Sequence, residues 1–192
     1  MTVIDSIWWL ITLIVLLAVT WIVLVSWKNG ISPMPSSKAV RIAVAEEVNR
    51  IPGYANILEA GSGWGTLGLS IIARCPGKRL TGIENSRIPL WFSQLFTVLH
   101  TQLFPVKNGQ GLLHSRAAFK RGDIYRSSFG DADIVLCYLF PGAMERLAPK
   151  CKQELPAGAT VISICFALPD KPPVRIITCK DRLQTKVYVY RF

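Results

Sequence analysis

Apolar residues form one long uninterrupted run near the amino terminus and many short runs after it. The long run extends from Ile7 to Trp27, 21 residues without a charge, a proline or a glycine. A helix that rises about 1.5 Å per residue would extend about 31 Å over this run, close to the hydrocarbon thickness of a bilayer. The run therefore predicts one transmembrane helix, with residues 1–28 as an amino-terminal membrane anchor.

Two other interpretations of this segment fit the sequence less well. A cleaved signal peptide has basic residues before its apolar run and a small-residue cleavage site after it, and this segment has neither. A buried core helix would carry a hydrophilic face, which is missing here. Asp5 is the only charged side chain before the run, whereas Lys28 and Lys38 follow it. The positive-inside rule therefore predicts a single-pass protein whose body lies on the cytoplasmic face of the inner membrane.

The rest of the chain alternates between helical and strand periodicity. A linker over residues 29–37 contains Pro33 and Pro35, and residues 38–192 follow as one domain. Helices are predicted from Ser36 or Ser37 to about residue 50, and over 67–73, 88–104 and 141–155. Strands are predicted over 56–60, 79–84, 117–124, 133–140, 160–168, 174–179 and 185–192. This alternation predicts an α/β fold with a largely parallel sheet, to which the last two strands add an antiparallel hairpin.

The net charge bears on the binding partners of the protein, and the cysteines bear on its compartment. From Lys28 onward, 22 basic residues face 11 acidic ones, a net charge of +11 that suits an anionic membrane surface. Nucleic acid is disfavoured, because the sequence has no basic run with interleaved aromatic residues. Five cysteines without CxxC spacing indicate a reducing compartment. His100 and His114 have no partner at metal-ligand spacing, so we expect no metal site.

Candidate chemistry begins where the first predicted strand ends. An acidic residue there is followed by a glycine-rich turn and then by a predicted helix; the residues are Glu59, Gly61, Ser62, Gly63 and Gly65. Glycines at such a turn let a ligand approach the backbone closely, and the helix start offers free N–H groups. A phosphate-binding P-loop is excluded, since no Gly-Lys-Ser/Thr follows. The third glycine comes one residue too early for a NAD fingerprint, although Gly68 leaves that alternative open.

Acidic residues also end the next two predicted strands. Glu84, followed by Asn85, stands where a nucleotide-binding Rossmann sheet hydrogen-bonds the ribose hydroxyls. Asp123, followed by Ile124, is placed to accept a hydrogen bond from an adenine amine, although an Asp after a glycine is also a common turn residue. Three acids that end successive strands would line the carboxyl edge of the sheet, where open α/β folds bind ligands.

These motifs resemble the first three motifs of class I S-adenosylmethionine-dependent methyltransferases. The matching residues are Glu59-x-Gly-x-Gly-x-Gly, Glu84 and Gly122-Asp123. The resemblance implies a Rossmann-like seven-stranded sheet with an antiparallel carboxyl-terminal hairpin, and S-adenosyl-L-methionine as the cofactor. The cofactor-binding residues that it implies are Glu59, Gly61, Ser62, Gly63, Gly65, Glu84, Asn85, Asp123 and Ile124.

A narrower resemblance covers roughly residues 50–192. The single span, Gly82-Ile83-Glu84, Tyr138-Leu139-Phe140-Pro141 and the run from Glu154 to Ala159 resemble one group of small membrane-anchored lysine methyltransferases. That group includes the mitochondrial enzymes that modify ATP synthase subunit c and the adenine nucleotide translocase, and its prokaryotic relatives are the most similar. The resemblance implies N-methylation of a lysine on a membrane-associated protein.

The candidate catalytic residue is Tyr138, which follows the fourth predicted strand. Many enzymes of this fold place an active-site residue there, beside the methyl group. A buried structural tyrosine is an equally good interpretation. Two positions depart from the family pattern: Trp64 replaces the usual Asp between the second and third glycines, and Pro89 lies five residues after Glu84 instead of soon after it.

Other functions remain open at this stage. The methyl acceptor could be a lipid, a quinone or another small membrane molecule, and nucleic-acid methylation has only the net charge in its favour. A non-catalytic scaffold that binds the cofactor is a further alternative, for which Trp64 and the missing helix after the fifth strand argue. Trp91 and Phe92 begin an aromatic helix and either cover the cofactor or belong to the core. The oligomeric state does not follow from the sequence.

Overall fold

The computed structural model describes residues 3–29, 35–103 and 116–192. The chain divides into two compact units, Met1–Pro33 and Met34–Phe192. Part of the predicted linker, His114 and the predicted helix end at Phe104 lie outside the described residues.

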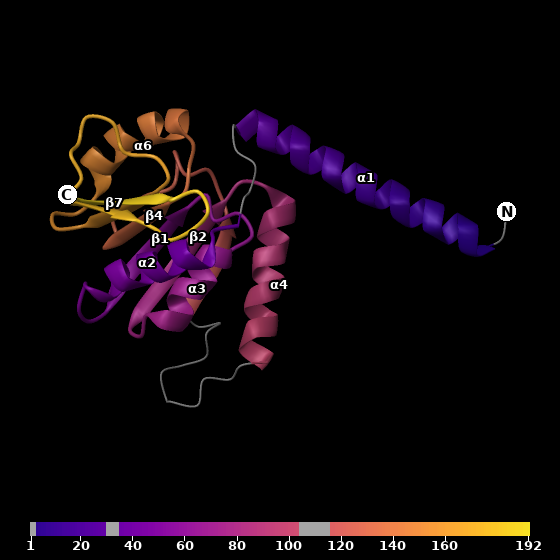
Figure 1. Cartoon of the computed structure of the whole chain (residues 1–192), viewed down its shortest axis with the longest axis horizontal. Coiled ribbons are helices and arrows are strands. Elements are labelled where there is room, and N and C mark those ends of the chain that lie inside the picture. The colour runs from indigo at the N-terminus through magenta and orange to yellow at the C-terminus, as the bar shows by residue number, and fades with distance from the viewer. Residues whose placement is uncertain (1–2, 30–34, 104–115) are drawn as a thin grey trace. The chain divides into compact units, whose positions relative to one another are not determined.

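The first unit contains helix α1, Val3–Asn29, drawn in indigo in Figure 1. Large apolar side chains point outward on all of its sides; Trp8 is 64% exposed and Leu17 is 61% exposed. A helix that is apolar all round needs an apolar surrounding to be stable. Among the described residues, α1 is the one helix that is long and apolar enough to cross a membrane.

The second unit is built on a sheet of seven strands in the order β3-β2-β1-β4-β5-β7-β6. The strands are β1 Ala55–Ala60, β2 Lys78–Glu84, β3 Ala117–Arg121, β4 Ile134–Cys137, β5 Thr160–Ile164, β6 Arg175–Thr178 and β7 Lys186–Arg191. The first five run parallel, and β7 runs antiparallel to both β5 and β6. The predicted fold class, including its terminal hairpin, is confirmed.

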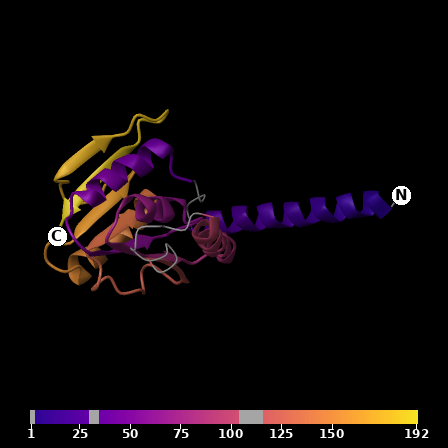
Figure 2. The ribbon, with the colours of Figure 1, turned by 90° about the horizontal axis from the view of Figure 1, so that it is seen from below.

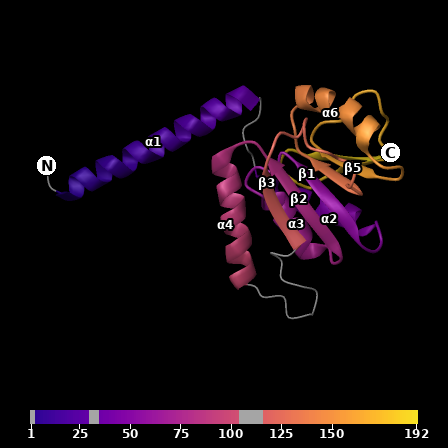
Figure 3. The same cartoon turned by 180° about the vertical axis from the view of Figure 1, so that it is seen from behind.

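Helices cover both faces of this sheet. Helices α2 Lys38–Asn49, α3 Thr66–Arg74 and α4 Arg87–Leu103 lie on one face, and α6 Pro141–Glu154 lies on the other (Figures 1 and 3). The view in Figure 2 looks along α4 and shows α2 and α3 on the same side of the strands. The core between α2, α3 and the sheet includes Val44, Ile71 and Ile134, all fully buried. Helix α2 begins after Ser37, whose Oγ accepts a hydrogen bond from the Val40 amide at 3.2 Å.

Three strands end earlier than the apolar pattern predicts. Strand β3 ends at Arg121, β4 at Cys137 and β5 at Ile164, three or four residues short of each predicted end. The chain turns at these points: Cys165 has a φ of +73°, which ends extended pairing after β5. Asp123 and Tyr138 therefore lie in loops beyond their strands and not within them.

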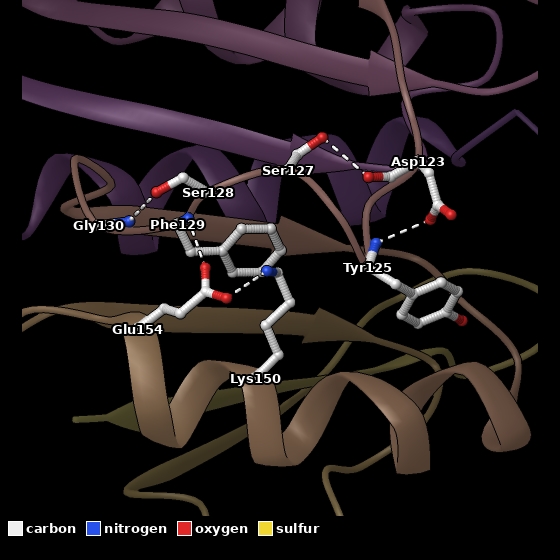
Figure 4. A network of polar contacts seen from close by, with 8 residues as sticks. All are labelled: Asp123, Tyr125, Ser127, Ser128, Phe129, Gly130, Lys150 and Glu154. Carbon is white, nitrogen blue, oxygen red and sulfur yellow. Dashed lines mark hydrogen bonds and ion pairs between the residues drawn. The ribbon is translucent and has the colours of Figure 1, made fainter.

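The connection from β3 to β4 is held by helix α6 instead of by a helix of its own (Figure 4). Phe129 is fully buried, and its backbone N–H donates to Glu154 Oε2 at 3.0 Å. Lys150 Nζ lies 2.5 Å from Glu154 Oε1 and 4.9 Å from the centroid of the Phe129 ring. The hydrogen bond from Lys150, and then the one from Phe129, lower the pKa of the Glu154 carboxyl. Glu154 thus anchors the segment that carries Asp123.

Candidate active site

The glycine-rich turn between β1 and α3 lies where the strand order reverses, since β1 has β2 on one side and β4 on the other. Open α/β sheets bind ligands at this switch point. Gly61, Gly63 and Gly65 have φ values of +74°, +51° and +73°, which residues with a side chain rarely adopt. The amides of Gly61 and Ser62 both donate to the Ile83 carbonyl at 3.0 Å, which joins the turn to the end of β2.

The same turn is packed too tightly for side chains. A Cβ on Gly61 would lie 2.9 Å from Leu139 Cδ2, in the loop after β4. A Cβ on Gly65 would lie 2.7 Å from Ser93 Cβ on α4 and 2.9 Å from Phe119 Cζ on β3. The turn therefore sits among three elements that are far apart in the sequence.

Glu84 connects the glycine turn to the start of α4. Its side chain is buried; Oε2 accepts a hydrogen bond from the Gly63 amide at 2.7 Å, and Oε1 accepts one from the Ser86 amide at 2.8 Å. Its carbonyl oxygen accepts a hydrogen bond from the Gly122 amide at 3.0 Å. A carboxylate offers about four acceptor positions, so two bonds leave room for ribose hydroxyls.

Glu59 is a buried carboxyl at the same edge. Desolvation raises its pKa to about 8; a hydrogen bond from the Gly68 backbone opposes this shift, and the charge of Glu84 adds to it. Glu59 is therefore mostly protonated at neutral pH. Among the residues that the structure describes, Glu59 Oε2 and Ser62 Oγ are buried without a hydrogen-bond partner. Two unsatisfied polar atoms at one turn fit a polar ligand that supplies the missing bonds.

Gly68 is a site residue whose role the sequence interpretation missed. A Cβ at Gly68 would collide with Glu59 Oε2 and would lie 2.9 Å from Leu80 Cδ1. Gly68 thus lets helix α3 approach the buried carboxyl closely. The available signal was a glycine inside a short amphipathic helix, which usually marks a close approach.

Asp123 lies at the same edge, where its side chain stabilises the turn that follows β3 (Figure 4). Its Oδ1 accepts a hydrogen bond from the Tyr125 amide at 2.9 Å, and its Oδ2 lies 3.8 Å from Arg126 Nε. Asn85 is exposed, with its Oδ1 3.1 Å from Ser86 Oγ. The turn explains the conformation of Asp123, whereas cofactor binding by Asp123, Asn85 and Ile124 stays a prediction.

Tyr138 directly follows β4 and is half-buried against the core. Burial raises the pKa of its hydroxyl, and the neighbouring Cys165 and Asp181 raise it further. The hydroxyl is therefore neutral at physiological pH and acts as a hydrogen-bonding group, not as a phenolate base. Leu139, the next residue, is the one that approaches Gly61, so the loop of Tyr138 lies against the glycine turn.

An aromatic cluster borders the turn. The Trp64 ring lies 5.2 Å from the Phe92 ring, which lies 5.2 Å from the Trp91 ring, centroid to centroid. Trp91 is 60% exposed, so its interpretation as a core residue is wrong. Leu90 and Ser93 face the sheet in its place. Among the described residues, no group of three or more His, Cys, Asp or Glu side chains could hold a metal ion.

We predict that Gly68→Ala destabilises the protein by about 1–3 kcal/mol, because the new Cβ must displace Glu59 and Leu80. Urea unfolding of the detergent-solubilised chain measures this change. Gly130→Ala is the matched control, since its Cβ would have no neighbour closer than 3.6 Å. Equal stability of the two variants would contradict the close approach at Gly68.

We predict that Glu59→Gln removes a pH dependence of stability. The pKa of Glu59 rises from 4.5 to about 8 on folding, so its contribution is fully present below pH 4.5 and is lost as the pH rises through about 8. Relative to the variant, the wild-type protein should lose up to roughly 5 kcal/mol across that window. Unfolding of both proteins at pH 5 to 9 tests this, and parallel stability curves would refute it.

Comparison with known proteins places this site in a family. Residues 59–175 match the ANTKMT methyltransferase domain family. The adenine nucleotide translocase lysine N-methyltransferase of Mus musculus is 32% identical over 119 residues, which cover 57% of this chain and 52% of that protein. The chain thus spans about half the length of this curated relative.

Solved structures share the fold at low sequence identity. An RNA methyltransferase from Salinibacter ruber, in complex with S-adenosyl-L-homocysteine, has a TM-score of 0.69 and 21% identity over 82% of this chain and 93% of its own. The rRNA methyltransferase aviRa from Streptomyces viridochromogenes has a TM-score of 0.60 and 11% identity, over 82% and 86% of the two chains. Because the sheet is that of these enzymes and the family match covers more than half of the sequence, the chain belongs to the ANTKMT methyltransferase domain family, within the class I S-adenosylmethionine-dependent methyltransferases.

Proposed function

We propose that this protein is a membrane-anchored enzyme that transfers a methyl group from S-adenosylmethionine to a lysine of a membrane-associated protein. The observation that carries the proposal is the 32% identity to a lysine N-methyltransferase, together with the family match over residues 59–175, which contain the candidate site. Helix α1 supports the membrane location. The proposal divides the chain into an anchor (1–28), a linker (29–37) and a catalytic domain (38–192) on the cytoplasmic face.

The residues at the switch point suit this cofactor. Glu84 would hold the ribose hydroxyls with the acceptor positions that Gly63 and Ser86 leave open. The glycine turn, with Glu59 Oε2 and Ser62 Oγ, would hold the remaining polar groups of the nucleoside and its amino-acid tail. Asp123 would accept a hydrogen bond from the adenine amine, and Asn85 and Ile124 would lie beside the adenine.

The cofactor supplies a methyl group that is already activated on a sulfonium, so the chain itself has two tasks. It must hold the lysine nitrogen in line with the methyl group, which supplies much of the rate acceleration. It must also favour the neutral amine, and a site poor in water does so by penalising the charged form. The neutral Tyr138 hydroxyl would orient the amine by a hydrogen bond, and the lysine proton would leave to solvent before transfer.

Helix α1 favours a second candidate acceptor equally well. A lipid, a quinone or another small membrane molecule would also be concentrated at the surface to which an apolar helix ties the domain. The two candidates share the same cofactor residues and differ only in the fraction of the cell that becomes methylated.

We expect methyl-labelled S-adenosylmethionine to label one protein band when the purified chain is added to membranes from cells that lack it. Glu84→Gln should weaken S-adenosylhomocysteine binding at least about tenfold and should abolish most of the label, because one of the two oxygens that hold backbone amides and would hold the ribose becomes a donor. Glu145→Gln, at an exposed position on α6, is the matched control. Label in the lipid fraction would move the assignment to the second candidate. Binding without label in any fraction would indicate a scaffold.

We expect Tyr138→Phe to lower kcat by about 10- to 100-fold and to leave S-adenosylhomocysteine affinity unchanged, because only the bond that orients the amine is removed. Calorimetry of binding, together with steady-state rates on the labelled protein substrate, separates the two effects. An unchanged kcat would show that Tyr138 is a structural residue.

A further inference from the structure

Helix α4 carries its large apolar side chains on the side that faces away from the sheet. Leu90, Ser93 and Thr97 face the sheet and are buried. Trp91 is 60% exposed and Leu99 is 40% exposed. We define the outer face of α4 by its exposed and half-buried apolar residues, which are Ile88, Trp91, Phe92, Leu95, Phe96, Val98 and Leu99.

In the usual amphipathic helix the large apolar side chains face the core. In α4 the residues that face the core are small, because the helix packs closely on the glycine turn. A Cβ on Gly65 would lie 2.7 Å from Ser93 Cβ. Helix α4 therefore lies too close to the glycine turn for a residue larger than Ser at position 93. The hydroxyls of Ser93 and Thr97 are satisfied within the helix, by the carbonyls of Leu90 and Ser93, each at 2.7 Å. The inner stripe is therefore small, and the bulk of the helix's apolar surface faces outward.

The outer face of α4 forms one continuous apolar surface. At about 100° per residue, its seven members spread over about 160° of the helix circumference, opposite the buried stripe. Apolar patches of this kind, with polar residues at their border, mark contacts with partners or membranes.

Basic residues border this surface. Arg87 begins α4 and is exposed, as is Arg121, which ends β3 two residues after Phe119 and so lies on the same face of the sheet. Helix α4 and β3 are neighbours (Figure 3), joined by a 3.1 Å hydrogen bond from Gln94 Nε2 to the Phe119 carbonyl. Arg121 pairs across the sheet with Glu84, three residues before Arg87, so these two cations lie at the same edge. The loop after Arg121 also carries Asp123, whose Oδ2 lies 3.8 Å from Nε of the 90% exposed Arg126.

We propose that the outer face of α4 inserts into the headgroup region of an anionic bilayer, with Arg87 and Arg121 against the lipid phosphates. Apolar faces with basic borders bind anionic interfaces in this way. The proposal rests on the membrane location in the proposed function but not on the choice of methyl acceptor. The nine residue steps from Asn29 to Lys38 allow at most about 30 Å between these two residues.

Docking through α4 would bring the candidate active site to the membrane surface. Phe92 belongs to the outer face and contacts Trp64 in the glycine turn. Gly63, in the same turn, donates its backbone N–H to the Glu84 carboxylate. A methyl acceptor that emerges at the headgroup level would therefore meet the site directly, whereas a soluble acceptor would gain nothing from this orientation.

A nitroxide at Leu99→Cys in the full chain tests the proposal in vesicles rich in phosphatidylglycerol. The control label is Gln153→Cys, exposed on α6, and both are made in a Cys165→Ser background because the other four cysteines are buried. We expect the ratio of oxygen to water-soluble nickel collisions to be at least about threefold higher at position 99 than at position 153. Replacing Arg87 and Arg121 by Glu, or using phosphatidylcholine alone, should reduce this difference.

Two results would overturn the proposal. The two labels could be equally accessible to the nickel reagent, which would leave the outer face in water. The label at position 99 could be immobile and shielded from both reagents, which would show that protein covers the face. Spin–spin broadening would identify that protein as a second copy of the chain. None of these readouts needs cofactor or methyl acceptor, so a failed docking test would leave the methyltransferase assignment to its own assay.

Discussion

The hydrogen bonds of the buried Glu84 carboxylate are the constraint on which the site depends. They join the Gly63 amide of one loop to the Ser86 amide at the start of α4, at 2.7 and 2.8 Å. Glycines allow the left-handed conformations of the turn, and this carboxylate gives the partly buried Gly63 amide a hydrogen-bond acceptor. The position of α4, and with it the aromatic border of the site, follows from the same two bonds.

A second buried carboxyl gives the site its electrostatic character. Glu59 and Glu84 lie close enough to interact, and burial raises the pKa of Glu59 to about 8. Near neutral pH this edge therefore carries less negative charge than its acidic residues suggest, because Glu59 is mostly protonated. That distribution lets Glu84 act as an acceptor while Glu59 is able to donate as well as accept.

The close packing of α4 on the glycine turn connects the candidate cofactor site with the surface of the domain. Ser93 must be small because it faces Gly65, and the helix accordingly turns Trp91 and Leu99 outward. Trp64, the departure from the family's usual Asp, packs on Phe92 at a ring distance of 5.2 Å. The close packing of Ser93 on Gly65 therefore accounts for the apolar face that we assign to the membrane, and Phe92 on that face contacts Trp64 in the turn.

The sequence by itself determined the order of helices and strands, the parallel sheet with its terminal hairpin and the apolar first helix, because these follow from local periodicity and composition. It also located the glycine turn and Glu84, whose spacing is local to one βαβ unit. Only the tertiary structure decided the contact of Gly68 with Glu59, the turn held by Asp123 and the outward orientation of Trp91. Those features depend on which distant segments meet, and that depends on packing between elements which no local pattern records.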